Sequence, residues 1–441
     1  MLGFDFSFWI IIVLISLIAL SVPVVIALGL VSFFGLYFIT GNVNVPLSLL
    51  NNTAYGAIRD YIFAVIPLFV LMGELISRSG AAEDLYNLIN KSLKKIPARL
   101  ALATIFGNTV FGAVTGVSIA SAAAFSKIAY PQMVKFNYNK TVAVGCIAGS
   151  ACLGMIIPPS ILMIVWGVLT EQSIGKLFIA GIIPGIILAI LFAIFCFVLA
   201  YFRPDLFGQG SENQALEINL TKRQYWGAVG VSFLIVLVLG GIWFGFFTPT
   251  EAAGIGALFA LILAILKGVS FKEILDSVLE TGKISAPILL ILICAQMYSR
   301  LLAMGGITDA LTNVFMDIGG NKVLILFIMV VVWFILGMFI DSVSIILLTV
   351  PIFAPIANKF LGFDPLSFAI IGILAIEAGL LTPPLGLCVY TVKGCVTDPE
   401  VTLGRIFYGS VPYWILLIVL AALIMMFPGL ASWLPAVMTK S

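Results

Sequence analysis

The sequence predicts an all-α polytopic membrane protein built as an inverted-topology repeat, with two re-entrant helical hairpins and two broken helices. Three observations carry this prediction. Hydrophobic residues make up 62% of the 441 residues and charged residues 10%, and the mean hydropathy is +1.21, which excludes a soluble globule. Apolar runs of about 20 residues, long enough to cross a hydrocarbon core, recur along the whole chain. The same short motifs and proline positions occur twice along the chain, in the same order.

The composition also excludes several functions. Histidine is absent, so the chain has no imidazole metal ligand, no imidazole general base and no His-activated nucleophile. Its six cysteines are scattered without a CxxC pair, which favours small buried side chains over metal or redox chemistry. The sequence has no basic stripe that would bind nucleic acid. Its hydropathy instead places the chain in the lipid bilayer. We expect no enzyme, because an intramembrane aspartyl protease needs a second Asp facing Asp341 and the apolar segments supply none.

The first half of the chain has two predicted parts. Residues 1–56 form N-terminal scaffold helices and a linker; Ser21-Val22-Pro23 divides residues 8–40 into two spans, because 33 helical residues would exceed one crossing. Residues 57–223 form the first repeat. Its predicted elements are a span at 57–77, an amphipathic surface helix at 82–96, a hairpin at about 98–136, a helix at about 140–170 broken by Pro158-Pro159, and a span at 177–201.

The second half continues the pattern. Residues 224–270 form connecting scaffold helices, at 225–246 and 250–266, after the polar connection 203–223. Residues 271–441 form the second repeat. Its predicted elements are a span at 274–301, a hairpin at about 322–359, a helix at about 366–396 broken by Pro383-Pro384, and a final span at 406–428.

The segment Gly107–Ser126 is the strongest sign of a re-entrant hairpin. It holds three glycines and several Ser and Thr residues, a poor composition for a transmembrane helix. Non-helical backbone at membrane depth is tolerated only where protein or a watery cavity surrounds it. We therefore place a hairpin tip at Thr115-Gly116-Val117-Ser118. A small-residue packing face between helices is the alternative.

The internal repeat decides between these interpretations. Corresponding landmarks occur in the same order with offsets of 222 to 228 residues. The pairs are Ser77-Arg78 with Ser299-Arg300, Val117-Ser118-Ile119 with Val343-Ser344-Ile345, Pro131 with Pro355, Pro158-Pro159 with Pro383-Pro384, and Gly181-Ile182-Ile183-Pro184 with Gly409-Ser410-Val411-Pro412. Inverted repeats with broken helices are typical of secondary transporters, whose sites lie near the bilayer midplane between the halves.

The charge distribution predicts the orientation. With a periplasmic N-terminus, six of the 22 Lys and Arg residues fall outside, namely Arg59, Lys176, Arg300, Lys322, Lys359 and Lys440. The other sixteen fall inside, a positive-inside bias. The count holds only if each hairpin returns to the side it came from.

Candidate site residues cluster at the tips and the breaks. Asp341 and Ser342 at the second tip offer hard oxygen ligands for an alkali cation, and a helix cap is the alternative role of Asp341. Glu377 is a second intramembrane acid, with a pair to Arg300 as its structural alternative. The proline breaks free backbone carbonyls that would complete one cation site per half. Thr115 and Ser160 are hydroxyl donors for an organic anion.

An ordered set of motifs resembles the large membrane subunit of tripartite ATP-independent periplasmic (TRAP) transporters, the DctM-like family. The motifs are TGVSIASAAAFSKIA, GMIIPPSILM, LFIAGIIPG, FTPTEAA, GMFIDS and GLLTPPLG, and they span essentially the whole chain. The resemblance implies a multi-pass protein of the bacterial inner membrane that imports a small organic anion by an elevator mechanism. Na⁺ is the implied coupling ion, with no other cofactor. A stand-alone Na⁺/dicarboxylate-type symporter or anion antiporter of similar architecture is the alternative.

The resemblance also implies partners and site residues. The partners are a small four-helix membrane subunit (Q-type) and a periplasmic substrate-binding protein (P-type). The family's cation sites match Ser118, Gly149, Ser150 and Pro158 in the first half, and Gly337, Asp341, Gly379 and Thr382 in the second. Substrate-contacting hydroxyls match Thr115 and Ser160. Some sialic-acid members have Ser-Gly-Ser where this chain has Thr-Gly-Val-Ser, so a smaller carboxylate or sulfonate fits as well.

Overall fold

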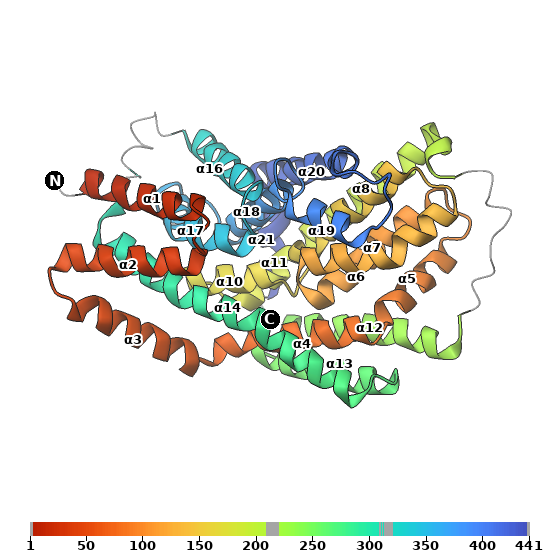
Figure 1. Cartoon of the computed structure of the whole chain (residues 1–441), viewed down its shortest axis with the longest axis horizontal. Coiled ribbons are helices and arrows are strands. Elements are labelled where there is room, and N and C mark those ends of the chain that lie inside the picture. Colours follow the sequence, from red (N-terminus) through yellow and green to blue (C-terminus); the bar gives the residue numbers. More distant parts are fainter. Residues whose placement is uncertain (1–2, 209–219, 308–309, 311, 313–320, 439–441) are drawn as a thin grey trace.

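The computed structural model is helical over most of the residues it describes, which are 3–208, 220–307, 310, 312 and 321–438. Within these ranges, eight helical segments have the length and apolar composition to cross a membrane. Figure 1 shows long helices lying roughly parallel to the longest axis, with the N-terminus at one end. The predicted all-α polytopic class is confirmed. Lys440 and residues 209–219 of the polar connection lie outside the described residues.

One group of elements packs largely among itself, and we call it the scaffold. It comprises α1 (Gly3–Ala19), α2 (Val24–Thr40), α3 (Asn44–Arg59), a 3-10 turn (Tyr61–Ala64) leading into α4 (Val65–Arg78), α5 (Ala81–Ser92), α12 (Lys222–Trp243), α13 (Pro249–Leu266) and α14 (Phe271–Met304). Helix α13 packs along α4, and α14 packs along α2 and α4 (Figure 1). Capping boxes begin α12, α13 and α14, in which Thr221, Thr248 and Ser270 pair with Gln224, Glu251 and Glu273.

The remaining helices form the core, to which each repeat contributes a hairpin, a broken helix and closing helices. The first repeat supplies α6 (Arg99–Thr115) and α7 (Ser118–Lys135), then α8 (Lys140–Ala151), α9 (Leu153–Ile156) and α10 (Ile161–Thr170), then α11 (Ile174–Phe202) and a short turn (Pro204–Leu206). The second supplies α16 (Lys322–Gly337) and α17 (Ser342–Pro355) with a π-helical turn (Ile356–Phe360), then α18 (Pro365–Gly379) and α19 (Leu387–Cys395), then α20 (Leu403–Met426) and α21 (Gly429–Met438).

The two hairpins come from opposite ends of the molecule. In Figure 1, α6 and α7 lie toward the right end, whereas α16 and α17 lie toward the left. Each hairpin packs on the broken helix of its own half, α6 on α8 and α9, and α16 on α18. The predicted inverted repeat, with its two hairpins and two broken helices, is confirmed.

Two stretches differ from the sequence prediction. Part of the predicted linker 41–52 belongs to α3, which begins at Asn44, where the Asn42 side chain accepts a hydrogen bond from the Asn44 amide (2.9 Å). Pro46 in the first turn is compatible with this start, because no intrahelical donor is needed there. The predicted final span stops at Met426 as a helix, and a further helix, α21, follows Pro428 and packs on α11 and α18.

Helix α5 is amphipathic as predicted, but it is not a simple surface helix. It packs against α12 and α6, with Tyr86 and Asn90 buried. Its Asp84 carboxylate pairs with Lys267 at the end of α13, and both side chains are largely buried. The amphipathic pattern therefore attaches the segment before the first hairpin to the scaffold.

A charge cluster joins the two repeats at the end of the core where α8 begins. Lys140 lies 2.6 Å from Asp398 and 3.1 Å from Glu400, both in the loop after α19. Tyr130 of α7 donates to the same Asp398 carboxylate (2.8 Å). The Lys140 ammonium, followed by the Tyr130 hydroxyl, holds the pKa of Asp398 at about 2. The contacts place this loop of the second repeat against the first hairpin.

Candidate functional site

The first hairpin turns at Gly116 and Val117, within the predicted tip. Gly116 has a left-handed backbone (φ +65°), and a Cβ there would lie 2.9 Å from the Pro159 carbonyl oxygen. Glycine is therefore required both by the turn and by the close approach of the helix break. The Ile161 amide, just after that break, points at the Gly116 carbonyl (3.4 Å). The first tip thus docks on the first break.

The second hairpin turns at residues 338–341 in an equivalent arrangement. The Leu385 amide, just after the second proline pair, donates to the Met338 carbonyl (3.2 Å). Asp341 caps α17, where its carboxylate accepts bonds from the Ser344 amide (3.0 Å) and the Ser344 hydroxyl (2.6 Å). The Asp341 side chain is otherwise exposed. The capping role considered from sequence is thus present, and it leaves room for a second role.

Glycine pairs bring each hairpin onto its broken helix. Gly112 of α6 faces Gly154 of α9, and Gly337 of α16 faces Gly379 of α18. Both pairs are related by an offset of 225 residues, the offset of the proline pairs. The small-residue packing considered for the first hairpin is therefore real, and it coexists with the turn.

Gly337→Ala tests the close approach. The added Cβ would lie 2.7 Å from the Ile376 carbonyl oxygen and 2.8 Å from the Gly379 Cα, and neither backbone atom can move away alone. We expect a loss of about 1–3 kcal/mol or more, seen as a melting temperature several degrees lower in detergent. Gly394→Ala in α19 is the control, since its Cβ meets open space. Equal melting temperatures for the two variants would contradict this packing.

Glu377 lies where the two tips meet. It is fully buried, its Oε2 accepts a bond from the Ser118 hydroxyl (2.5 Å), and its Oε1 accepts one from the Ser342 hydroxyl (2.9 Å). Arg300 lies elsewhere, so the alternative pair of Glu377 with Arg300 is wrong. Sequence spacing could not show this, because the two serines begin helices in opposite halves of the repeat.

The other predicted site residues of the first broken helix contact their own neighbours rather than Glu377. The Ser150 hydroxyl donates to the Cys146 carbonyl (2.6 Å) and accepts from the Asn108 amide (2.8 Å). Gly149 lies against the Tyr413 ring, and Pro158 is buried in the first break.

Three hydroxyl groups near the breaks bond to neighbouring backbone. Thr115 donates to the Phe111 carbonyl (3.1 Å), and Ser160 to the Met155 carbonyl (2.6 Å). Thr382 donates to the Gly379 carbonyl (2.7 Å). Each hydroxyl uses its single proton in this way, so its lone pairs remain available as acceptors.

Two buried oxygens of the first hairpin have no hydrogen-bond partner among the described residues. They are Asn108 Oδ1 and Ser121 Oγ. A Cβ on Gly154 would lie 3.2 Å from Ser121 Oγ, and Asn108 contacts Ser150, so both atoms belong to the region between hairpin and break. Buried polar atoms are normally satisfied, so an unpaired pair of oxygens here fits a bound cation or water.

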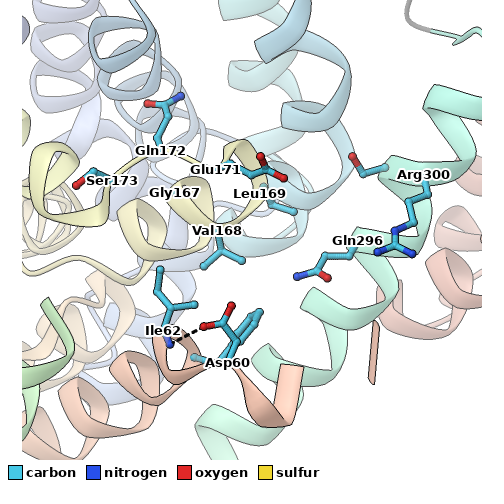
Figure 2. Close-up of a pocket in the computed structure, with 12 residues that line it drawn as sticks. Asp60, Ile62, Gly167, Val168, Leu169, Glu171, Gln172, Ser173, Gln296 and Arg300 are labelled. Carbon is cyan, nitrogen blue, oxygen red and sulfur yellow. Dashed lines mark hydrogen bonds between the residues drawn. The ribbon is translucent and has the colours of Figure 1, made fainter. Parts of the chain in front are cut away.

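A polar cavity of about 650 Å³ lies between scaffold and core and contains none of the predicted site residues. Figure 2 shows Asp60 and Gln296 facing it from the scaffold, with Arg300 one turn further along α14. The segment joining α10 to α11 closes the other side with Glu171, Gln172 and Ser173. Two of its lining residues, Ser299 and Arg300, are the second copy of the repeated Ser-Arg pair, although the first copy does not line this cavity.

Two inverted halves whose re-entrant tips meet between broken helices define a secondary membrane transporter. The chain belongs to the family of the tripartite ATP-independent periplasmic transporter, DctM component, which matches residues 11–430. It is 31% identical over 379 residues to the C4-dicarboxylate TRAP transporter large permease protein of Pseudomonas aeruginosa, covering 86% of this chain and 87% of that protein.

Two further comparisons show how widely the fold extends. The ectoine TRAP transporter large permease protein of Halomonas elongata is 29% identical over 426 residues, covering 96% of this chain and 97% of that protein. The crystal structure of the Alcanivorax borkumensis YdaH transporter superposes with a TM-score of 0.60 at 13% identity, covering 88% of this chain and 89% of that chain. This last likeness concerns the fold alone.

Proposed function

We propose that this permease imports a small organic anion together with Na⁺, the two being carried by the core helices past the scaffold. The observation that carries the proposal is the meeting of both hairpin tips at Glu377, surrounded by serine hydroxyls and broken helices. Hydroxyl, carbonyl and carboxylate oxygens are the ligands that hard cations prefer. The ten predicted residues remain our proposed cation and substrate contacts.

The unpartnered oxygens favour a cation or water between the first hairpin and its broken helix. Asn108 Oδ1 and Ser121 Oγ are buried acceptors without a partner among the described residues, next to Ser150 and Gly154. At the second tip, Asp341 is exposed and carries the negative charge that would offset a cation leaving water.

The division into scaffold and core supports an elevator movement. The hairpins and broken helices pack on one another, whereas α2, α4, α13 and α14 pack mainly among themselves. The Asp84–Lys267 pair fastens α5 to the scaffold directly before the first hairpin. We infer that the segment between α5 and α6 is one hinge of the moving core.

The family name states that the assembly has three components. We propose that this chain works with a small membrane subunit and a periplasmic binding protein, in the bacterial inner membrane with a periplasmic N-terminus. The relatives named for C4-dicarboxylates and for ectoine are 31% and 29% identical to this chain. Overall identity therefore does not select a substrate, and we propose a small carboxylate or sulfonate.

Sodium coupling gives a direct test. In proteoliposomes that contain both membrane subunits and loaded binding protein, we expect uptake to rise steeply with external Na⁺ and to vanish when choline replaces it. The reason is that an empty second site would leave the Asp341 carboxylate without a compensating positive charge during the movement. Equal uptake under a proton gradient without Na⁺ would refute the coupling.

A further inference from the structure

Glu377 contacts both halves of the molecule through its two carboxylate oxygens. Ser118 is the first residue of α7 and Ser342 the first residue of α17, so each serine directly follows a hairpin tip. Both hydroxyls donate to the same carboxylate, at 2.5 and 2.9 Å. One buried side chain on α18 therefore joins the two tips.

The position of Glu377 in the repeat explains why a single acid serves both halves. Cys152 precedes it by 225 residues, the offset of the proline pairs, so the two positions are equivalent. The Cys152 thiol donates to the Glu377 carbonyl (3.7 Å). Equivalent positions in contact lie beside the pseudo-twofold axis of the repeat. Two carboxylates there would repel each other, so only one half carries the acid.

The chemistry of a serine hydroxyl gives this contact a consequence. Each hydroxyl has one proton and two lone-pair positions. Because Ser118 and Ser342 both donate their proton to Glu377, both present only lone pairs to the surroundings of the tips. A hydroxyl held in this way is a cation ligand, whereas one with its proton turned outward repels a cation.

We propose that Glu377 is a positioning residue that holds both serine hydroxyls as acceptors and thereby couples the two tip cation sites. The inference rests on the proposed function for the cations themselves, whereas the joining of the tips rests on the hydrogen bonds alone. Partners that orient a metal ligand typically change metal affinity by about 10–100-fold when removed.

Glu377→Gln changes how the two serine hydroxyls are oriented while keeping the size of the side chain. The amide has one accepting oxygen and one donating NH₂, so only one serine can still donate while the other must accept and turn its proton toward its tip. We expect the Na⁺ concentration for half-maximal thermal stabilisation of the purified protein to rise about tenfold or more, and its cooperativity to fall toward one ion. Glu251→Gln is the control, because a capping box accepts Gln and this residue lies in the first turn of the scaffold helix α13.

A mutant cycle without Na⁺ tests the joining of the tips independently of transport. Melting temperatures are measured for Ser118→Ala, Ser342→Ala and the double variant, in the wild-type and in the Glu377→Ala background. We expect the two serine effects to be non-additive in the wild type, because both act on one carboxylate, and additive once Glu377 is absent. Ser126→Ala, whose hydroxyl bonds only within α7, is the control.

The outcomes distinguish the joining of the two tips by Glu377 from its role in positioning the serine hydroxyls for cations. Serine effects that are additive in the wild type would overturn the joining of the tips. Na⁺ stabilisation that is present but identical in Glu377→Gln would overturn the positioning role while leaving sodium coupling intact. A non-additive cycle without any Na⁺ stabilisation of the wild type would confirm the joining and refute the cation sites.

Discussion

Asp341→Asn is expected to reduce Na⁺-dependent uptake by about 100-fold or more while leaving the protein folded. Asparagine caps helices about as well as aspartate, so α17 keeps its first turn. What is lost is the negative charge beside the second tip. A unit charge about 4 Å from a cation is worth about 4 kcal/mol at an effective dielectric constant of about 20. That corresponds to roughly a thousandfold in cation affinity.

The chain offers a matched control for this substitution. Asp364 caps α18 in the same way, accepting bonds from the Ser367 amide and hydroxyl, both at 2.7 Å. It lies at the far end of the helix that carries Glu377 and Gly379, away from the tips. Asp364→Asn should transport normally, as judged by uptake into the same proteoliposomes. If Asp341→Asn also transports normally with unchanged sodium dependence, Asp341 is only a cap.

Local sequence was sufficient for the architecture because each unusual feature has a local cause. Gly116 turns the first hairpin, the proline pairs interrupt the long helices, and Pro23 separates the first two spans. These residues act on their own backbone, so their effect can be predicted without knowing what packs against them. The repeat then supplied the pairing of hairpin with broken helix.

The contacts at the centre could not be predicted in the same way. Glu377 lies 259 residues from Ser118 and 35 from Ser342, and its partners are fixed by the rotation of α18 against both hairpins. An acidic side chain at membrane depth is expected to pair with a basic side chain, and Arg300 is the candidate that the sequence offers. Two neutral serine hydroxyls donate to the Glu377 carboxylate instead, and no feature of the sequence composition indicates such a pairing.

The polar cavity was missed for a related reason. Its lining comes from the turn before α4, the last residues of α10 with the loop that follows, and one face of α14, three segments that are distant in sequence. None of them is unusual by itself. The helices α3 and α21 were missed because turn-forming residues also occur directly before helices, where Asn42 and Pro428 stand in this structure.

The charge of the cavity leads to the second large expectation, that free substrate is transported negligibly without its binding protein. The cavity carries Arg300 against Asp60 and Glu171, a formal charge of −1. Arg59 and Lys359 line adjoining cavities and bring the group only to +1. A field so close to neutral cannot concentrate a dilute organic anion. A docked binding protein would instead present its ligand at high effective concentration.

Reconstituted vesicles with both membrane subunits and a Na⁺ gradient provide the measurement. Substrate is added alone, then with the cognate binding protein, then with a non-cognate binding protein that carries the same ligand. We expect uptake with the cognate protein only, because delivery requires docking as well as a loaded ligand. Strong uptake of free substrate would instead identify a stand-alone symporter. Since the ligand of the cognate protein raises that protein's melting temperature, a thermal screen against carboxylates and sulfonates would identify the substrate to use.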